Sequence, residues 1–171
     1  MGKRTIGMWL YENSGGAEIA KRIITLLKER EIDVINNVNL RNAFSKNGQI
    51  IYGEGNLILD ELDLFFSYNA GDQKKYQVDL YQTLNRVIPM INSYHAFELT
   101  ENKFQTSFVL RQNGIETPDY KFCHSGDTDK LKSIIKEWDK MVYKPTDGWG
   151  GMGLVKIENE DSLNMILQFL N

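Results

Sequence analysis

The sequence predicts an α/β protein built around a mostly parallel sheet. Two observations carry this prediction: segments of strand type and helix type alternate along the chain, and one apolar run, Leu62–Tyr68, is nearly continuous. Parallel strands covered by helices on both faces have such runs, and a β-α-β-α order favours a layered α/β structure. With 171 residues the chain is long enough for two small domains, which we assign to residues 1–95 and 96–171.

In the first domain, strand and helix patterns follow one another between clear turn signals. The expected helix at 17–30 has one apolar stripe at helical spacing. Asn47-Gly48 and the glycines at 53–55 mark turns, with a short hairpin expected between them. The expected elements are a strand at 5–11, a helix at 17–30, strands at 32–38 and 62–68, and a helix at 76–87.

The second domain continues the alternation. A helix is expected at 97–112, where Gly114 ends it, since glycine commonly lies just past a helix end. The remaining expected elements are strands at 120–124, 141–144 and 154–157 and helices at 128–140 and from Asp161 onward.

Composition excludes several classes of function. The net charge is −3, and no basic stripe favours nucleic acid as a partner. No run approaches the roughly 18 apolar residues that a membrane helix needs, so no membrane partner is expected. Cys123 is the only cysteine, which rules out an intrachain disulfide and fits a cytoplasmic protein. His95 and His124 are too isolated to predict a metal site or a catalytic triad.

The most informative segment is a glycine-rich loop that follows Lys144-Pro145. Its four glycines, which precede another apolar strand, are Gly148, Gly150, Gly151 and Gly153. Glycine lets main-chain N–H groups approach a ligand closely, and successive N–H groups can form a concavity for phosphate oxygens. A Walker loop instead places Lys and Ser/Thr after the last glycine, at the start of a helix. The alternative is a flexible hairpin tip with a solvated Lys144.

Lys103 is the second lysine of interest, because it lies beside apolar residues on the expected helix at 97–112. Alone, this position has a simple explanation: lysine stems often lie along apolar surface with the ammonium group in water. Lys103 and Lys144 are 41 positions apart.

Four motifs together resemble the entry to an ATP-grasp domain. In chain order they are Ile91-Asn92-Ser93, Glu101-Asn102-Lys103, the Leu110–Pro118 element with Gly114-Ile115 inside it, and Val142-Tyr143-Lys144-Pro145 before the glycines. The sequence is most similar to the branch that contains glutathione synthetase, D-alanine ligase and the enzymes that add glutamate to ribosomal protein tails. The resemblance covers residues 92–171 well, whereas residues 1–91 match in general form only.

The resemblance implies a parallel-sheet pre-ATP-grasp domain at 1–95, on the substrate side, followed by the N-terminal lobe of an ATP-grasp domain at 96–171. Lys103 and Lys144 would contact the phosphates of ATP, and Gly148, Gly150, Gly151 and Gly153 would form a loop that closes over them. The implied reaction joins a small-molecule or peptide carboxylate to an amine through an acyl phosphate. The resemblance assigns no catalytic residue in this chain.

The resemblance also implies Mg²⁺ as a cofactor, with its ligands in a second lobe that would follow Asn171. We therefore expect this chain to be a truncated part of a ligase, inactive alone, with the missing lobe or a second copy as a partner. Two alternatives stay open: a non-catalytic binding or assembly module, and a nucleotide- or sugar-binding domain of the response-regulator or periplasmic type. The Lys103–Lys144 pair argues against the second.

Substrate-binding candidates lie in the loops that follow parallel strands, where open α/β sheets usually bind ligands. Asn13, Ser14 and Gly15 can present donors to a substrate carboxylate at a helix N-terminus. Asn92 and Ser93 lie at the domain junction and are the other candidates. The competing explanation is helix capping for the first group and a simple turn for the second.

Overall fold

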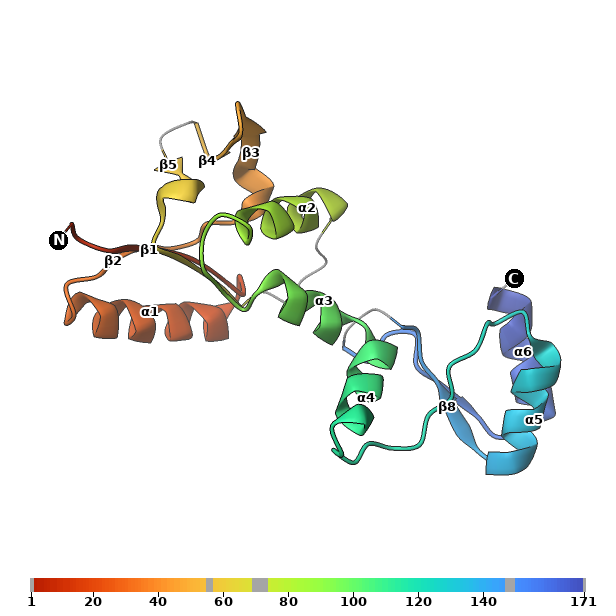
Figure 1. Cartoon of the computed structure of the whole chain (residues 1–171). Helices are drawn as coiled ribbons and strands as arrows, with labels where there is room; N and C mark the ends of the chain where they lie inside the picture. Colours follow the sequence, from red (N-terminus) through yellow and green to blue (C-terminus); the bar gives the residue numbers. More distant parts are fainter. Residues whose placement is uncertain (1, 55–56, 69–73, 147–149, 171) are drawn as a thin grey trace. The chain divides into compact units, whose positions relative to one another are not determined.

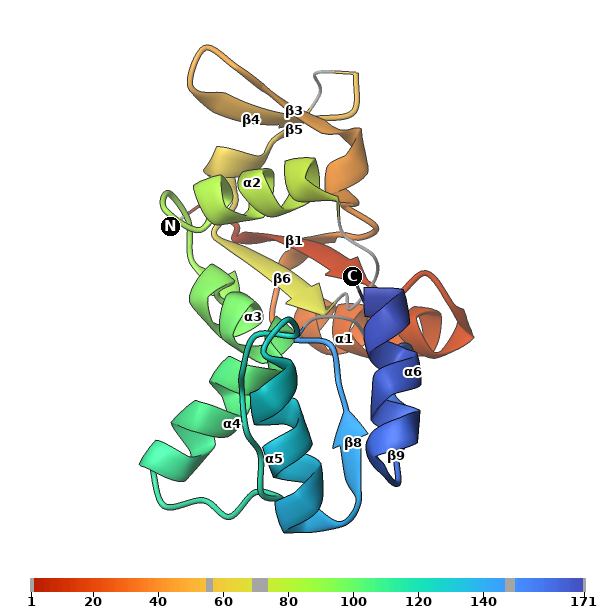
Figure 2. The ribbon, with the colours of Figure 1, turned by 90° about the vertical axis from the view of Figure 1, so that its right-hand side faces the viewer.

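The computed structural model describes residues 2–54, 57–68, 74–146 and 150–170 (Figures 1 and 2). By internal packing the chain divides into two compact units, Met1–Phe97 and Glu98–Asn171. Their roles as a substrate-side domain and a nucleotide-binding lobe remain predictions. Within the described ranges, no helix is both long and apolar enough to cross a membrane.

The first unit contains a parallel sheet, as predicted, and a fourth strand that was not expected completes it. In spatial order its strands are β2 (Asp33–Ile35), β1 (Thr5–Leu10), β6 (Leu64–Tyr68) and β7 (Met90–Ile91). Every neighbouring pair is parallel, and Leu10 pairs with Tyr68. The carboxyl ends of β1 and β6 therefore lie at the same edge of the sheet.

Helices cover both faces of this sheet. Met8 and Leu10 pack with Ala20 of α1 (Ser14–Lys28), whereas Trp9 belongs to the core formed with Leu80 of α2 (Lys75–Leu84). Side chains alternate along a strand, so β1 contributes to both cores. Figure 1 shows α1 and α2 on opposite sides of the sheet, which explains why these strands are apolar almost throughout.

A small antiparallel sheet is inserted between β2 and β6. It consists of β3 (Ala43–Lys46), β4 (Gln49–Tyr52) and β5 (Leu57–Ile58), with short 3₁₀ helices at Leu40–Asn42 and Leu59–Glu61. Asn47 and Gly48 have φ of 52° and 82°, as a two-residue hairpin turn requires. The hairpin is thus built around Asn47-Gly48, and only its second strand lies between the two predicted turns.

The second unit packs helices on a two-stranded antiparallel sheet. Helix α3 (Tyr94–Glu101) leads into it from the first unit. Its other elements are α4 (Lys103–Gln112), α5 (Thr128–Trp138), β8 (Met141–Tyr143), β9 (Val155–Ile157) and α6 (Glu160–Leu170). The buried core comes from α5, β9 and α6 and consists of Ile135, Ile157, Leu163 and Leu167.

Two expected elements were wrong. The single helix at 97–112 is two helices, because the Asn102 side chain accepts a hydrogen bond from the Gln105 N–H at 3.0 Å and starts a new helix. The strand expected at 120–124 is neither helix nor strand. A strand needs a hydrogen-bonded neighbour, and among the described residues β8 pairs only with β9.

Candidate functional site

The break between α3 and α4 determines where Lys103 lies. Asn102 caps α4, so Lys103 is the first residue of that helix. The single hydroxyl proton of Thr106 is shared between the Leu99 carbonyl at 2.8 Å and the Asn102 carbonyl at 3.0 Å, which ties the end of α3 to the start of α4. Lys103 thus occupies a helix start, where the first N–H groups have no partner within the helix.

One backbone hydrogen bond joins this helix start to the segment after β8. The Lys103 N–H donates to the Thr146 carbonyl oxygen at 2.7 Å. Thr146 lies two residues after Lys144, which directly follows β8. The bond therefore brings the two lysines predicted from the sequence to one place in the second unit.

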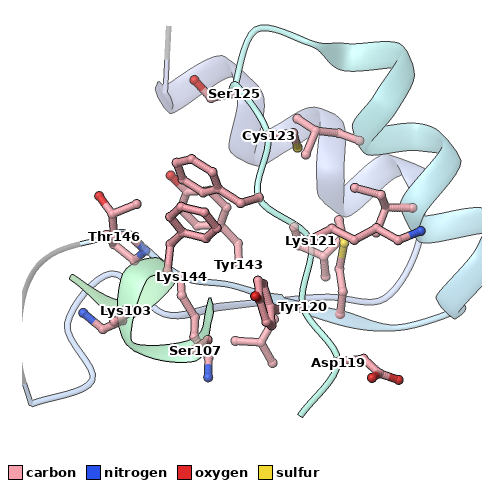
Figure 3. Close-up of a pocket in the computed structure, with 18 of the residues that line it drawn as sticks. Lys103, Ser107, Asp119, Tyr120, Lys121, Cys123, Ser125, Tyr143, Lys144 and Thr146 are labelled. Atoms are coloured by element: carbon pink, nitrogen blue, oxygen red, sulfur yellow. The ribbon is translucent and has the colours of Figure 1, made fainter. Parts of the chain in front are cut away.

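Both lysines line a cavity of about 1240 Å³. Figure 3 shows Lys103, Lys144 and Thr146 on one side of it, with Asp119 and Lys121 on the other. Apolar side chains form much of the remaining wall; they are Phe104, Phe122, Leu131, Ile134, Met141, Val142, Ile157, Leu163, Ile166 and Leu167. Ligand pockets commonly combine an apolar wall with a few charged groups, as this one does.

Lys121 is engaged on its own side of the cavity. Its ammonium group forms a hydrogen-bonded ion pair with Glu137 and lies 5.3 Å from the centre of the Trp138 ring. This hydrogen bond holds the pKa of the Glu137 carboxyl below its ordinary value. These contacts hold the Lys121 ammonium group beside Glu137 and Trp138.

The glycine-rich loop has the backbone geometry expected of it. Gly150, Gly151 and Gly153 have φ of 64°, 77° and 75°, a region that side chains disfavour. A methyl group on Gly153 would also lie 2.7 Å from Cγ of Pro145. The loop therefore returns close to the residue that follows Lys144. Gly148, the fourth predicted glycine, lies outside the described residues.

The substrate-binding candidates of the first unit have structural roles in this fold. The Asn13 side chain accepts a hydrogen bond from the Gly16 N–H at 2.8 Å and caps α1, while Ser14 and Gly15 form its first turn. Ser93 similarly accepts a hydrogen bond from the Ala96 N–H at 3.2 Å. Capping therefore accounts for Asn13, and Ser93 caps the start of α3 where a simple turn was the alternative. Substrate binding by these residues stays a prediction.

Asn92 is held in the first unit by hydrogen bonds of its backbone. Its N–H donates to the Ser67 carbonyl at 3.4 Å, and its carbonyl accepts a hydrogen bond from the Tyr81 hydroxyl. The residues that line the cavity all lie between Thr100 and Leu167, so none of the five substrate-binding candidates is among them.

Sequence reasoning missed Thr146 and Phe122 as parts of the site. Thr146 contributes a backbone carbonyl, for which its side chain gives no signal. Phe122 lies in the segment expected to be a strand, and the apolar character of such a segment does not indicate a pocket. Cys123 also lines the cavity, and burial raises the pKa of its thiol.

The described residues offer a metal ion no ready site. They contain no group of three or more His, Cys, Asp or Glu side chains placed to hold one. His124 uses Nδ1 to accept a hydrogen bond from the Gly126 N–H at 3.0 Å. Two lysine ammonium groups suit the oxygens of an anion such as phosphate. Gly150, Gly151 and Gly153 are not among the residues that line the cavity.

Comparison with protein families confirms the resemblance seen in the sequence. Residues 100–170 match the ATP-grasp domain. A curated relative, tetrahydromethanopterin:alpha-L-glutamate ligase of Methanocaldococcus jannaschii, is 29% identical over 155 residues, which are 90% of this chain and 52% of the relative. The chain thus spans about half the length of that relative.

Solved structures show the same fold. A RimK domain ATP-grasp protein from Sphaerobacter thermophilus superimposes with a TM-score of 0.68 at 14% identity, covering 98% of this chain and 58% of that protein. D-alanyl-alanine synthetase A from Vibrio cholerae superimposes with a TM-score of 0.64 at 17% identity, covering 98% of this chain and 56% of the synthetase. At these identities the likeness concerns the fold alone.

Proposed function

Because residues 100–170 match the ATP-grasp domain, we propose that this chain supplies the phosphate-binding part of an ATP-dependent carboxylate–amine ligase. The hydrogen bond from the Lys103 N–H to the Thr146 carbonyl carries the proposal, since it brings Lys103 and Lys144 to one cavity. The name of the curated relative, a glutamate ligase, supports the reaction class.

In the proposed reaction, a carboxylate oxygen attacks the γ-phosphorus of ATP and the bond to the β,γ-bridging oxygen breaks. The products of this step are an acyl phosphate and ADP. The amine then attacks the acyl carbon, phosphate leaves, the nitrogen loses a proton and an amide remains. Negative charge develops on the phosphoryl oxygens during the first step, and positive groups fixed beside them lower the barrier.

Three features of this chain serve that step. The ammonium groups of Lys103 and Lys144 bind phosphate oxygens through charge-assisted hydrogen bonds. The positive φ of Gly150, Gly151 and Gly153 lets the loop backbone approach the same oxygens. The apolar wall of the cavity keeps water away from a hydrolysable acyl phosphate.

Magnesium would bind together with ATP and neutralise charge on its phosphates. Within the described part of the chain, no cluster of three or more acidic, histidine or cysteine side chains is placed to hold a metal ion. We therefore infer that the chain by itself binds the nucleotide without completing ligation. Because the curated relative is named for glutamate, this amino acid is the first amine substrate to test on a longer protein that contains this sequence.

The test is a calorimetric titration of the 171-residue chain with Mg-ATP and with tripolyphosphate. Lys103→Gln and Lys144→Gln should each lower the affinity for both ligands about 10- to 100-fold, because each variant loses one charge-assisted hydrogen bond. Lys136→Gln is the matched control, because Lys136 pairs with Glu160 and is not among the residues that line the cavity. Equal affinity of the three variants would refute the proposal.

A further inference from the structure

A stacked pair of phenylalanine rings forms part of the cavity wall. The ring centroids of Phe104 and Phe122 lie 4.1 Å apart, and the ring planes differ by 11°. Both side chains line the cavity that contains Lys103 and Lys144. Phe104 directly follows Lys103 in the first turn of α4, so one helical turn carries both an ammonium group and an aromatic ring.

The exposure of Phe122 is unusual for a large apolar side chain. It is 58% exposed and belongs to none of the three buried clusters of the described residues. Its one aromatic contact in the described structure is Phe104, which covers a single face of the ring. A planar group that covered the other face would remove apolar surface from water and extend the stack.

We propose that Phe122, held in place by Phe104, stacks on the base of the nucleotide whose phosphates Lys103 and Lys144 bind. This inference rests on the proposed function and adds the wall that contacts the base. Stacking on a phenyl ring needs only a π face and reads no hydrogen-bonding edge, so it tolerates different bases. Loss of one such contact typically weakens binding about 5- to 150-fold.

The experiment compares ATP with tripolyphosphate, which has the phosphates without the base. Phe122→Leu keeps an apolar side chain and removes the ring. Phe108→Leu is the matched control, because Phe108 is 47% exposed and lies 5.9 Å from Phe104 in the same aromatic cluster but is not among the cavity-lining residues. Phe122→Tyr keeps a stacking ring and checks that a substitution at this position leaves the fold intact.

Phe122→Leu should lower the affinity for ATP and GTP about tenfold or more and leave the affinity for tripolyphosphate unchanged. Phe108→Leu and Phe122→Tyr should bind all three ligands with the affinity of the wild type. Saturation-transfer NMR on the wild-type chain with ATP should place the strongest signals on the base protons. If Phe122→Leu binds ATP and tripolyphosphate as the wild type does, or if the base protons receive no saturation, the stacking inference is overturned.

The lysine variants separate the two proposals. If Lys103→Gln and Lys144→Gln lose tripolyphosphate while Phe122→Leu keeps ATP, the proposed function stands and the base contact falls. If the wild-type chain binds neither ATP nor tripolyphosphate at millimolar concentrations, both proposals fall.

Discussion

A methyl group added at Gly153 tests whether the glycine-rich loop packs against Pro145. Gly153 has φ of +75°, where an alanine costs about 1–2 kcal/mol. The new Cβ would also lie 2.7 Å from Cγ of Pro145, and relief of such overpacking typically costs about 1–3 kcal/mol. Gly153→Ala should therefore lower the free energy of unfolding of the second unit by roughly 2–5 kcal/mol.

Gly150→Ala is the control for the backbone contribution. Gly150 has φ of +64°, and no heavy atom lies within 4 Å of the position that an added Cβ would occupy. Its loss should be limited to the backbone cost of roughly 1–2 kcal/mol. In a Gly153→Ala, Pro145→Ala double variant the clashing ring atoms are gone, so the two changes should show a favourable coupling of about 1–3 kcal/mol.

The assay is urea unfolding followed by pulsed hydrogen exchange and mass spectrometry. Peptides from residues 128–170 report the second unit alone, so unfolding of the first unit does not enter the result. If Gly153→Ala and Gly150→Ala cause equal losses, or if Pro145→Ala rescues nothing, the loop does not return to Pro145 in solution.

Three further predictions concern single groups. Gly16→Ala should lower the free energy of unfolding by about 1–3 kcal/mol or more, because its Cβ would lie 2.0 Å from the Tyr11 carbonyl oxygen. In Gly15→Ala the new Cβ would lie 3.5 Å from the nearest atom, so the free energy of unfolding should stay nearly unchanged. Equal losses in the two variants would contradict this start of α1. Burial raises the pKa of Tyr81 above 10.0, so the folded state keeps this proton longer than the unfolded state and loses stability as pH rises above 10. Urea unfolding should show that, between about pH 9 and about pH 11, Tyr81→Phe loses less free energy of unfolding than the wild type. An equal pH dependence in the two proteins would refute the raised pKa of Tyr81. Burial also raises the pKa of Cys123 above 9.0, so iodoacetamide should alkylate it more slowly at neutral pH than a reference peptide thiol, and an equal rate would show an ordinary pKa.

Local sequence patterns determined much of the fold. The apolar run Leu62–Tyr68 predicted a strand covered on both faces, and β6 is one of the two central strands of the parallel sheet. The Asn47-Gly48 turn and the positive φ of the loop glycines also follow from residue type alone. These features are predictable because each depends on a few neighbouring residues.

The resemblance to ATP-grasp proteins implies that Lys103 and Lys144 act together, and the structure shows how they meet. Lys103 and Thr146 are 43 positions apart, and only the folded chain brings the N–H of one to the carbonyl of the other. No periodicity in either segment encodes that bond. The sequence therefore predicted which side chains to examine, and the tertiary structure decided that they line one cavity.

The helix expected at 97–112 and the strand expected at 120–124 were wrong because local patterns do not show such contacts. A stripe at helical spacing continues across Asn102, yet its side chain caps a new helix and places Lys103 at the helix start. Residues 120–124 have the composition of a strand, but a strand forms only beside a hydrogen-bonded neighbour. The sequence by itself determined the local elements and the residue types of the site. The folded chain alone decided their pairing, the wall that Phe104 and Phe122 form, and the cavity, because these depend on contacts between distant segments.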